Sequence, residues 1–237
     1  MKTRQGIRLF PVTAAVVLGL VFSACGNGPD RPVDVADGET REGDVNVVNA
    51  SITLGEESEV KGNLRSVNGA VELGSGARAG TVETVNGRVR IGSDGETGEV
   101  STVNGSIRLG EDGRVRGEIS SINGSVTLKA GSEVSGDIST VNGNIRVESA
   151  RIEGSLSTRT GDVSLLDGSH LAGDLTVDRV QRGDRDRRPR VVIGPDTVVE
   201  GTIRAARRIE LHVHESASIG DVEGVEPKSF SGARPGD

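Results

Sequence analysis

The chain of 237 residues is poor in the residues that usually build a globular core. It has no tryptophan, no tyrosine and three phenylalanines, two of which, Phe10 and Phe22, lie within the first 24 residues. Aromatic side chains supply much of the buried area of ordinary domains, so their scarcity argues against such a core. The single cysteine, Cys25, excludes disulfide bonds within the chain. A narrow, purely aliphatic core is the architecture that remains.

The most regular feature of the sequence is a repeat of 18 or 19 residues. It contains Val-Asn-Gly or a close variant, and its asparagines are Asn49, Asn68, Asn86, Asn104, Asn123 and Asn142. A period this short is too small for a helical hairpin and matches one coil of a β-solenoid. Coils stack about 4.8 Å apart, so we expect the asparagines to form a ladder of amide hydrogen bonds at a structural corner. We expect the glycines of these corners to supply a positive φ.

Aliphatic residues in each repeat are separated by polar residues, as Val100, Ile107 and Leu109 illustrate. This alternation is typical of strands with one buried face. The fold class predicted is therefore all-β, a single-stranded β-helix (β-solenoid) of about 8–9 coils, over residues 43–219. We expect its winding to be right-handed.

The N-terminus has the features of a secretory signal, with Lys2, Arg4 and Arg8 before an apolar stretch at residues 12–22. It ends in Phe22-Ser23-Ala24-Cys25, which resembles the lipobox of bacterial lipoproteins. The resemblance implies a signal peptide at residues 1–24 and lipidation of Cys25. Residues 25–42, rich in glycine, proline and charge, are then a flexible tether. Because Gly26 and not aspartate follows the cysteine, the resemblance implies the outer membrane, facing the periplasm or the cell surface.

The charge of the chain argues against nucleic-acid binding. Without the three basic residues of the signal, 25 of the 28 basic residues remain against 35 acidic ones, a net charge of −10. Phosphate binding needs a basic surface, which an acidic rod does not provide in general.

An arginine-rich insert at residues 178–190 interrupts the repeat. With arginines of the next coil it forms a candidate anion-binding region: Arg179, Arg182, Arg185, Arg187, Arg188, Arg190, Arg204, Arg207 and Arg208. Its partner would be an anionic component of the envelope. The alternative is a solvated loop whose charges pair among themselves. Residues 220–237 return to a composition typical of a disordered tail.

The sequence contains no recognisable catalytic or cofactor motif. The three histidines are His170, His212 and His214, and no cysteine or ordered acid cluster joins them at a metal-binding spacing. We therefore expect no metal, no cofactor and no enzymatic activity.

Three families share parts of the pattern. Phrases such as Val134-Ser135-Gly136-Asp137-Ile138 resemble the bactofilins, bacterial cytoskeletal proteins that polymerise through a compact β-helix. The Thr-Val-Asn-Gly repeats resemble bacterial adhesin-type domains. Residues 103–114 resemble the hexapeptide repeat of left-handed β-helix acyltransferases, in which His170 would be the catalytic candidate.

These resemblances imply three functions. The first is a non-enzymatic, lipid-anchored envelope scaffold that self-associates end to end. The second is a surface-displayed, adhesin-like binding module that uses the solenoid faces and the arginine loop. The third and most remote is an acyltransferase.

Overall fold

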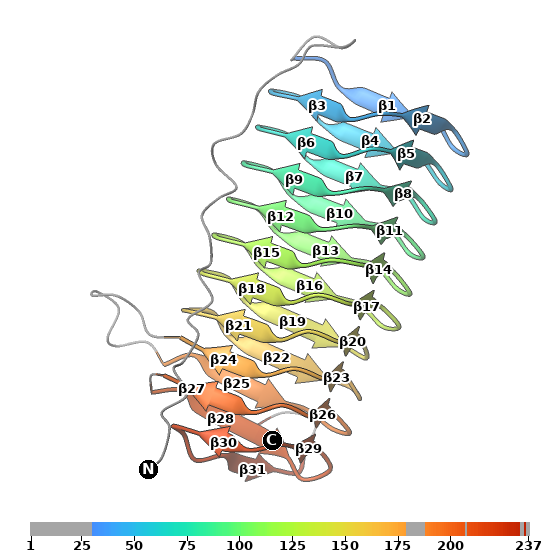
Figure 1. Ribbon diagram of the computed structural model, residues 1–237. Coiled ribbons are helices and arrows are strands. Elements are labelled where there is room, and N and C mark those ends of the chain that lie inside the picture. The colour runs from blue at the N-terminus through green and yellow to red at the C-terminus, as the bar shows by residue number, and fades with distance from the viewer. Residues whose placement is uncertain (1–29, 179–187, 207, 233–234, 236–237) are drawn as a thin grey trace, which may run out of the picture.

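The computed structural model describes residues 30–178, 188–206, 208–232 and Pro235. Every regular element in these residues is a β-strand, and the strands form three parallel sheets that run the length of a rod (Figure 1). None of the described residues form a helix that could cross a membrane. The predicted signal peptide and Cys25 lie outside the described residues.

Each sheet takes one strand from every coil. Sheet A contains β1 (Val33–Val35), β4 (Ile52–Leu54), β7 (Val71–Leu73), β10 (Val89–Ile91), β13 (Ile107–Leu109), β16 (Val126–Leu128), β19 (Ile145–Glu148), β22 (Val163–Leu166), β25 (Arg190–Ile193), β28 (Glu210–His214) and β31 (Lys228–Phe230). Sheet B contains β2 (Thr40–Glu42), β5 (Glu59–Lys61), β8 (Arg78–Ala79), β11 (Glu96–Thr97), β14 (Arg114–Val115), β17 (Glu133–Val134), β20 (Arg151–Ile152), β23 (His170–Leu171), β26 (Val198–Val199) and β29 (Ser218–Ile219). Sheet C contains β3 (Val45–Val47), β6 (Leu64–Ser66), β9 (Val82–Thr84), β12 (Val100–Thr102), β15 (Ile119–Ser121), β18 (Ile138–Thr140), β21 (Leu156–Thr158), β24 (Leu175–Val177), β27 (Ile203–Ala205) and β30 (Val222–Glu223).

The β-solenoid prediction is confirmed, and the rod is longer than expected. We number the coils from coil 1 (β1–β3) to coil 10 (β28–β30), with β31 added to sheet A. Ten coils replace the expected 8–9 and give a rod about 45 Å long. The right-handed winding stays a prediction.

Both predicted boundaries of the solenoid were wrong. Residues 33–42, expected to belong to the tether, form β1 and β2, because Val33 and Val35 pair in register with Ile52 and Leu54. At the other end, part of the expected tail forms β30 and β31. There Phe230 lies edge-on to His214, with ring centroids 5.1 Å apart.

The core is a column of aliphatic side chains, as the alternation predicted. Val100, Ile107 and Leu109 are buried, and so are their counterparts in neighbouring coils. One inward position of sheet C is polar: Thr84 and Thr102 are buried there, and their hydroxyls donate to the carbonyls of Gly69 and Gly87 at 3.3 Å. The threonine of the Thr-Val-Asn-Gly repeat is therefore a core residue that satisfies a backbone acceptor at the corner.

The glycines of the Val-Asn-Gly corners are needed for close stacking and not for a positive φ, which corrects the sequence prediction. Neither Gly87 nor Gly105 has a positive φ. A Cβ atom on Gly105 would lie 1.9 Å from the carbonyl oxygen of Gly87 in the coil before it. Positive φ occurs instead at the turn between sheets A and B, at residues such as Asp94 and Asp112.

The asparagine side chains form a continuous ladder along the corner between sheets C and A. Each Nδ2 donates to Oδ1 of the preceding asparagine over 2.8–2.9 Å, from Asn142 back to Asn49. The Asn49 amide donates to the Asp30 carboxylate at 2.7 Å, and the Thr160 hydroxyl donates to Asn142 at 2.9 Å. All bonds point the same way, and aligned amides of this kind polarise one another.

We expect Asn104→Ala to destabilise the protein by about 1–2 kcal/mol, because it removes two ladder bonds and leaves Asn86 and Asn123 without these partners. Urea unfolding measures the change. The matched control is Asn46→Ala, on the half-buried outer face of sheet C and outside the ladder, which should change stability by less than about 0.5 kcal/mol. Equal effects of both substitutions would contradict a stabilising ladder.

The alternation of 18- and 19-residue repeats has a structural cause. In coil 2 the chain passes from Val60 through Lys61 to Gly62 before sheet C begins. Coils 3 and 4 lack a counterpart of Lys61, since Gly80 and Gly98 directly follow Ala79 and Thr97. The corner between sheets B and C is therefore indented at these two coils.

The arginine-rich insert lies between β24 and β25, at the corner where other coils carry Val-Asn-Gly. The pairing of β22 with β25 and of β24 with β27 keeps the register across this position. Residues 179–187 lie outside the described residues.

Candidate functional site

The structure only partly describes the predicted anion-binding region. Arg179, Arg182, Arg185, Arg187 and Arg207 lie outside the described residues, while Arg188 and Arg208 are exposed. The two arginines placed in strands belong to different sheets, Arg190 to sheet A and Arg204 to sheet C. The predicted region as a whole stays a prediction.

Both of these strand arginines already face carboxylates. Arg190 Nε lies 3.8 Å from Glu210 Oε2. Arg204 pairs with Asp174 and, at 3.3 Å, with Glu223. The backbone N–H of Thr202, together with the Arg204 guanidinium, lowers the pKa of Asp174. Arg204 is therefore paired with two carboxylates, and its predicted role in anion binding stays a prediction.

The histidines are distributed over two sheets. His212 and His214 lie on β28, and His214 Nδ1 is 2.9 Å from the Ser216 hydroxyl. His170 lies on β23 with Nε2 2.9 Å from Glu200 Oε1. No three His, Cys, Asp or Glu side chains converge on a metal position within the described part of the chain.

The exposed column of sheet B alternates in charge from coil to coil. The residues paired in register are Glu59, Arg78, Glu96, Arg114, Glu133 and Arg151, followed by His170. Opposite charges on neighbouring strands stabilise a sheet, and like charges directly opposite destabilise it. The column therefore shows the order of charges that favours the stability of the sheet.

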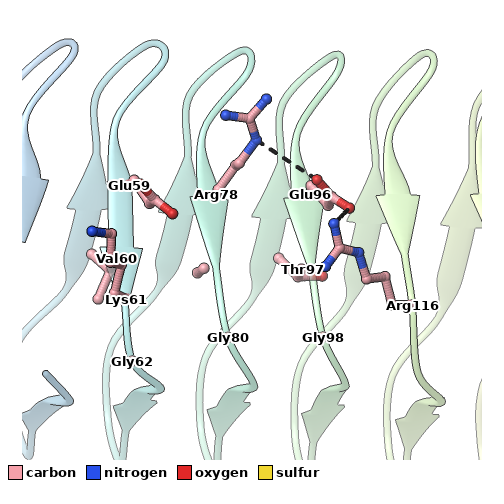
Figure 2. A pocket seen from close by; sticks show the side chains of 11 residues that line it. Glu59, Val60, Lys61, Gly62, Arg78, Gly80, Glu96, Thr97, Gly98 and Arg116 are labelled. Atoms are coloured by element: carbon pink, nitrogen blue, oxygen red, sulfur yellow. Dashed lines mark ion pairs between the residues drawn. The ribbon is translucent and has the colours of Figure 1, made fainter. Parts of the chain in front are cut away.

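A groove of about 360 Å³ crosses the indented corner between coils 2 and 5 (Figure 2). Gly80 and Gly98 line it, and Lys61 and Arg116 belong to the coils on either side. Arg116 pairs with Glu96, Arg78 Nε lies 3.6 Å from the same carboxylate, and Lys61 lies 3.0 Å from Glu42. Since each of these cations faces a carboxylate, the groove presents polar walls without an uncompensated positive charge.

Sheet A departs from the alternating pattern. Arg90 on β10 pairs in register with Arg108 on β13, and both side chains are exposed. Neither arginine has an ion-pair partner among the residues that the structure describes. We call these two residues the arginine face. Arg90 also lies opposite Glu72 on β7, and Arg108 lies opposite Thr127 on β16. The contact between the two arginines is the unfavourable one, at a cost of about 0.2–1 kcal/mol.

A column of like negative charge lies at the edge of sheet C. Glu99, Glu118 and Asp137 immediately precede the paired strands β12, β15 and β18, and all three are exposed. Although the residue is exposed overall, partial burial of its carboxyl raises the pKa of Glu118. A hydrogen bond from Ser139 opposes this effect, and the charges of Glu99 and Asp137 raise the pKa further. We call these three residues the acidic edge.

Glu148 on β19 is the carboxylate with the clearest cationic environment on sheet A. Its two oxygens accept from Lys129 Nζ at 2.6 Å and from Arg146 Nε at 2.5 Å. The hydrogen bond from Lys129, followed by that from Arg146, lowers the pKa of Glu148 below its ordinary value of 4.5. This carboxylate therefore favours the folded state when it is ionised.

We expect the contribution of Glu148 to be complete above its ordinary pKa and to be lost as the pH falls through the lower folded-state pKa. Glu148→Gln should cost about 1 kcal/mol at neutral pH and reduce the acid dependence of stability. Urea midpoints measured from pH 7 down to acid test this. The control is Glu56→Gln, whose side chain has no ion pair in the described structure. An unchanged pH profile in Glu148→Gln would contradict the expectation.

Comparisons with protein-family models, with curated proteins and with solved structures find no match for this chain. Its class follows from the strand pairing alone: the protein is a parallel β-solenoid with three sheets.

Sequence reasoning missed the arginine face and the acidic edge, although the signal was available. Arg90 and Arg108 are 18 residues apart, and Glu99 and Glu118 are 19 apart, at equivalent positions of the repeat. Aligning the exposed positions as well as the aliphatic ones would have shown both columns.

Proposed function

We propose that this protein is a non-enzymatic scaffold of the bacterial cell envelope, anchored by a lipid on Cys25. The observation that supports this most directly is the continuity of the three sheets, each with a strand from every coil. Stacked coils that share backbone hydrogen bonds and an asparagine ladder make a stiff rod, and a stiff rod holds attached molecules at a set distance.

The proposed anchor stands close to the rod. Because β1 begins at Val33, the tether from Cys25 is eight residues long instead of the expected eighteen. Eight extended residues span at most about 28 Å. The first coil of the rod therefore faces the membrane at short range in this proposal.

The two ends of the rod support self-association. Strands β1–β3 and β29–β31 each have a sheet neighbour on one side only, and unpaired strand edges are surfaces on which chains join. At the last coil Ile219, Val222 and Val225 are only partly buried. End-to-end joining of this kind is what the resemblance to bactofilins implies.

Two measurements test the proposal. Labelling with a radioactive fatty acid should mark the wild-type protein and not Cys25→Ser. The Cys25→Ser protein should sediment as oligomers and show rods longer than about 45 Å in negative-stain images. Absence of label would overturn the anchor, and a sharp monomer at high concentration would overturn end-to-end assembly.

A second candidate is a binding module for anionic envelope material, with the arginine face as its site. It is favoured by the exposure of Arg90 and Arg108 without ion-pair partners in the described residues. It predicts that inorganic polyphosphate binds the Cys25→Ser protein, and that Arg90→Ser/Arg108→Ser abolishes this binding. Equal binding by both proteins would exclude this site.

A further inference from the structure

We propose that copies of this chain associate side by side and parallel, with the arginine face of one rod against the acidic edge of the next. The proposal deepens the scaffold function and rests on the lipid anchor for the relative height of the rods. The partner is a second copy because this chain itself carries both complementary surfaces, at matching positions.

The two surfaces lie at the same levels along the rod. Coil 4 contains Arg90 on sheet A and Glu99 at the edge of sheet C, and coil 5 contains Arg108 and Glu118 in the same two places. Two parallel rods without an axial shift would therefore bring Arg90 level with Glu99, and Arg108 level with Glu118, to within one strand spacing of about 4.8 Å.

Both surfaces place like charges next to each other, and one contact between two rods would explain both. On sheet B the exposed charges alternate in sign over six successive strands. The arginine face and the acidic edge break that rule with opposite signs. Like charges that are unfavourable within one rod become favourable when the opposite column of another rod approaches.

The anchor limits the difference in height between neighbouring rods, and the complementary charges then select the level at which they match. A tether of eight residues from Cys25 to Val33 holds every first coil within about 28 Å of the membrane. Rods on the same membrane therefore all have their first coils on the membrane side. This arrangement favours contact by their sides and leaves their last coils free for end-to-end joining.

The interface is heterologous, because a different surface of each copy takes part. Each rod in a pair keeps one arginine face or one acidic edge free, so the contact propagates into rows or closes into rings. Exposed ion pairs contribute little individually. The membrane compensates by raising the local concentration of anchored rods, so we expect association in lipid vesicles that weakens as salt screens the charges.

Disulfide cross-linking tests both the contact and its level. Thr127→Cys on β16 and Ser139→Cys on β18 place thiols on sheets A and C of coil 6, beside the two surfaces. The full-length, lipidated double variant is reconstituted in vesicles and oxidised, and the products are separated by size. Thr127→Cys with Asn46→Cys is the displaced control, because Asn46 lies in coil 1.

We expect a ladder of covalent oligomers from the coil 6 pair and only monomer from the displaced pair. Adding Arg90→Ser and Arg108→Ser to the coil 6 pair should abolish the ladder. Adding Arg114→Ser and Arg151→Ser, which removes the same charge from sheet B, should leave it intact. A chain that carries both Arg90→Glu/Arg108→Glu and Glu99→Arg/Glu118→Arg should recover it.

The outcomes separate this inference from the scaffold proposal. Monomers in vesicles that retain the lipidated protein would overturn side-by-side association and leave the anchor standing. Equal cross-linking by the matched and the displaced pair would overturn the level match. Loss of cross-linking together with polyphosphate binding to Arg90 and Arg108 would assign the arginine face to an anionic ligand instead.

Discussion

Gly105→Ala should destabilise the protein by about 3 kcal/mol or more, as overpacking against a rigid backbone does. The new Cβ atom would lie 1.9 Å from the carbonyl oxygen of Gly87 and 3.1 Å from Oγ1 of Thr102. Relief of the first contact needs coils 3 and 4 to move apart, since the obstructing atom belongs to the backbone. That movement would stretch the hydrogen bond between the side-chain amides of Asn104 and Asn86, which measures 2.8 Å.

The repeat contains a natural control for this substitution. Ala50 occupies the same place as Gly105, at the corner after β3 of coil 1. There the neighbouring chain is the short segment before β1, whose Asp30 accepts from Asn49, and an alanine fits in a buried position. Ala50→Gly should therefore change stability by no more than about 1 kcal/mol. Urea unfolding of both variants gives the comparison. A loss from Gly105→Ala no larger than that from Ala50→Gly would show that close stacking does not control this corner.

A clash in the middle of a solenoid has a further consequence. Each coil contacts mainly its neighbours, so stability is a sum of coil and interface contributions. With the interface between coils 3 and 4 weakened, Gly105→Ala should unfold in two steps, where the wild-type protein unfolds in one. Calorimetry distinguishes the two cases. A single transition at a lower temperature would mean that the remaining coils stay coupled.

Ile119→Ala should cost about 3–4 kcal/mol, the usual effect of deleting a large buried aliphatic side chain. Ile119 is 0% exposed and pairs in register with Val100 and Ile138, so coils on both sides hold the cavity open. The chain has no aromatic residue in the core to shift into the space. Chemical denaturation measures the loss.

The control for Ile119→Ala is the next residue of the same strand. Ser120 points outward on β15, and Ser120→Ala should stay within about 0.5 kcal/mol of wild type. A small effect at Ile119 would mean that the column collapses around the missing atoms. A large effect at Ser120 would mean that the outer face of sheet C is in contact with another molecule.

The repeat and the aliphatic alternation were sufficient to predict the fold, because both reflect local chemistry. The alternation at Val100, Ile107 and Leu109 predicts an inward face whichever strands lie beside it. The ends were harder to predict. Strand β31 carries Ser229 opposite the buried Val213, so backbone pairing and not an apolar pattern adds this strand to sheet A.

The candidate site was predictable only in part, because the ion-pair partners of a charged side chain lie a full coil away in the sequence. Arg204 and Arg90 look alike in the sequence. Arg204 forms ion pairs with Asp174 and Glu223 from neighbouring coils. Arg90 lies between Glu72 and Arg108 and forms no ion pair among the described residues. A difference of one residue in coil length changes which side chains are neighbours, as the missing counterpart of Lys61 in coils 3 and 4 demonstrates.

The sequence by itself determined the class of the fold, the length of the coil, the aliphatic core and the lone cysteine proposed as the anchor. Each of these follows from the residue types and their period. Only the tertiary structure decided that the corner glycines serve close stacking, that the rod has ten coils, and which cations lack a partner in the described residues. The reason is physical: contacts between coils join residues 18 or more positions apart, and the stacking register alone sets which of them meet.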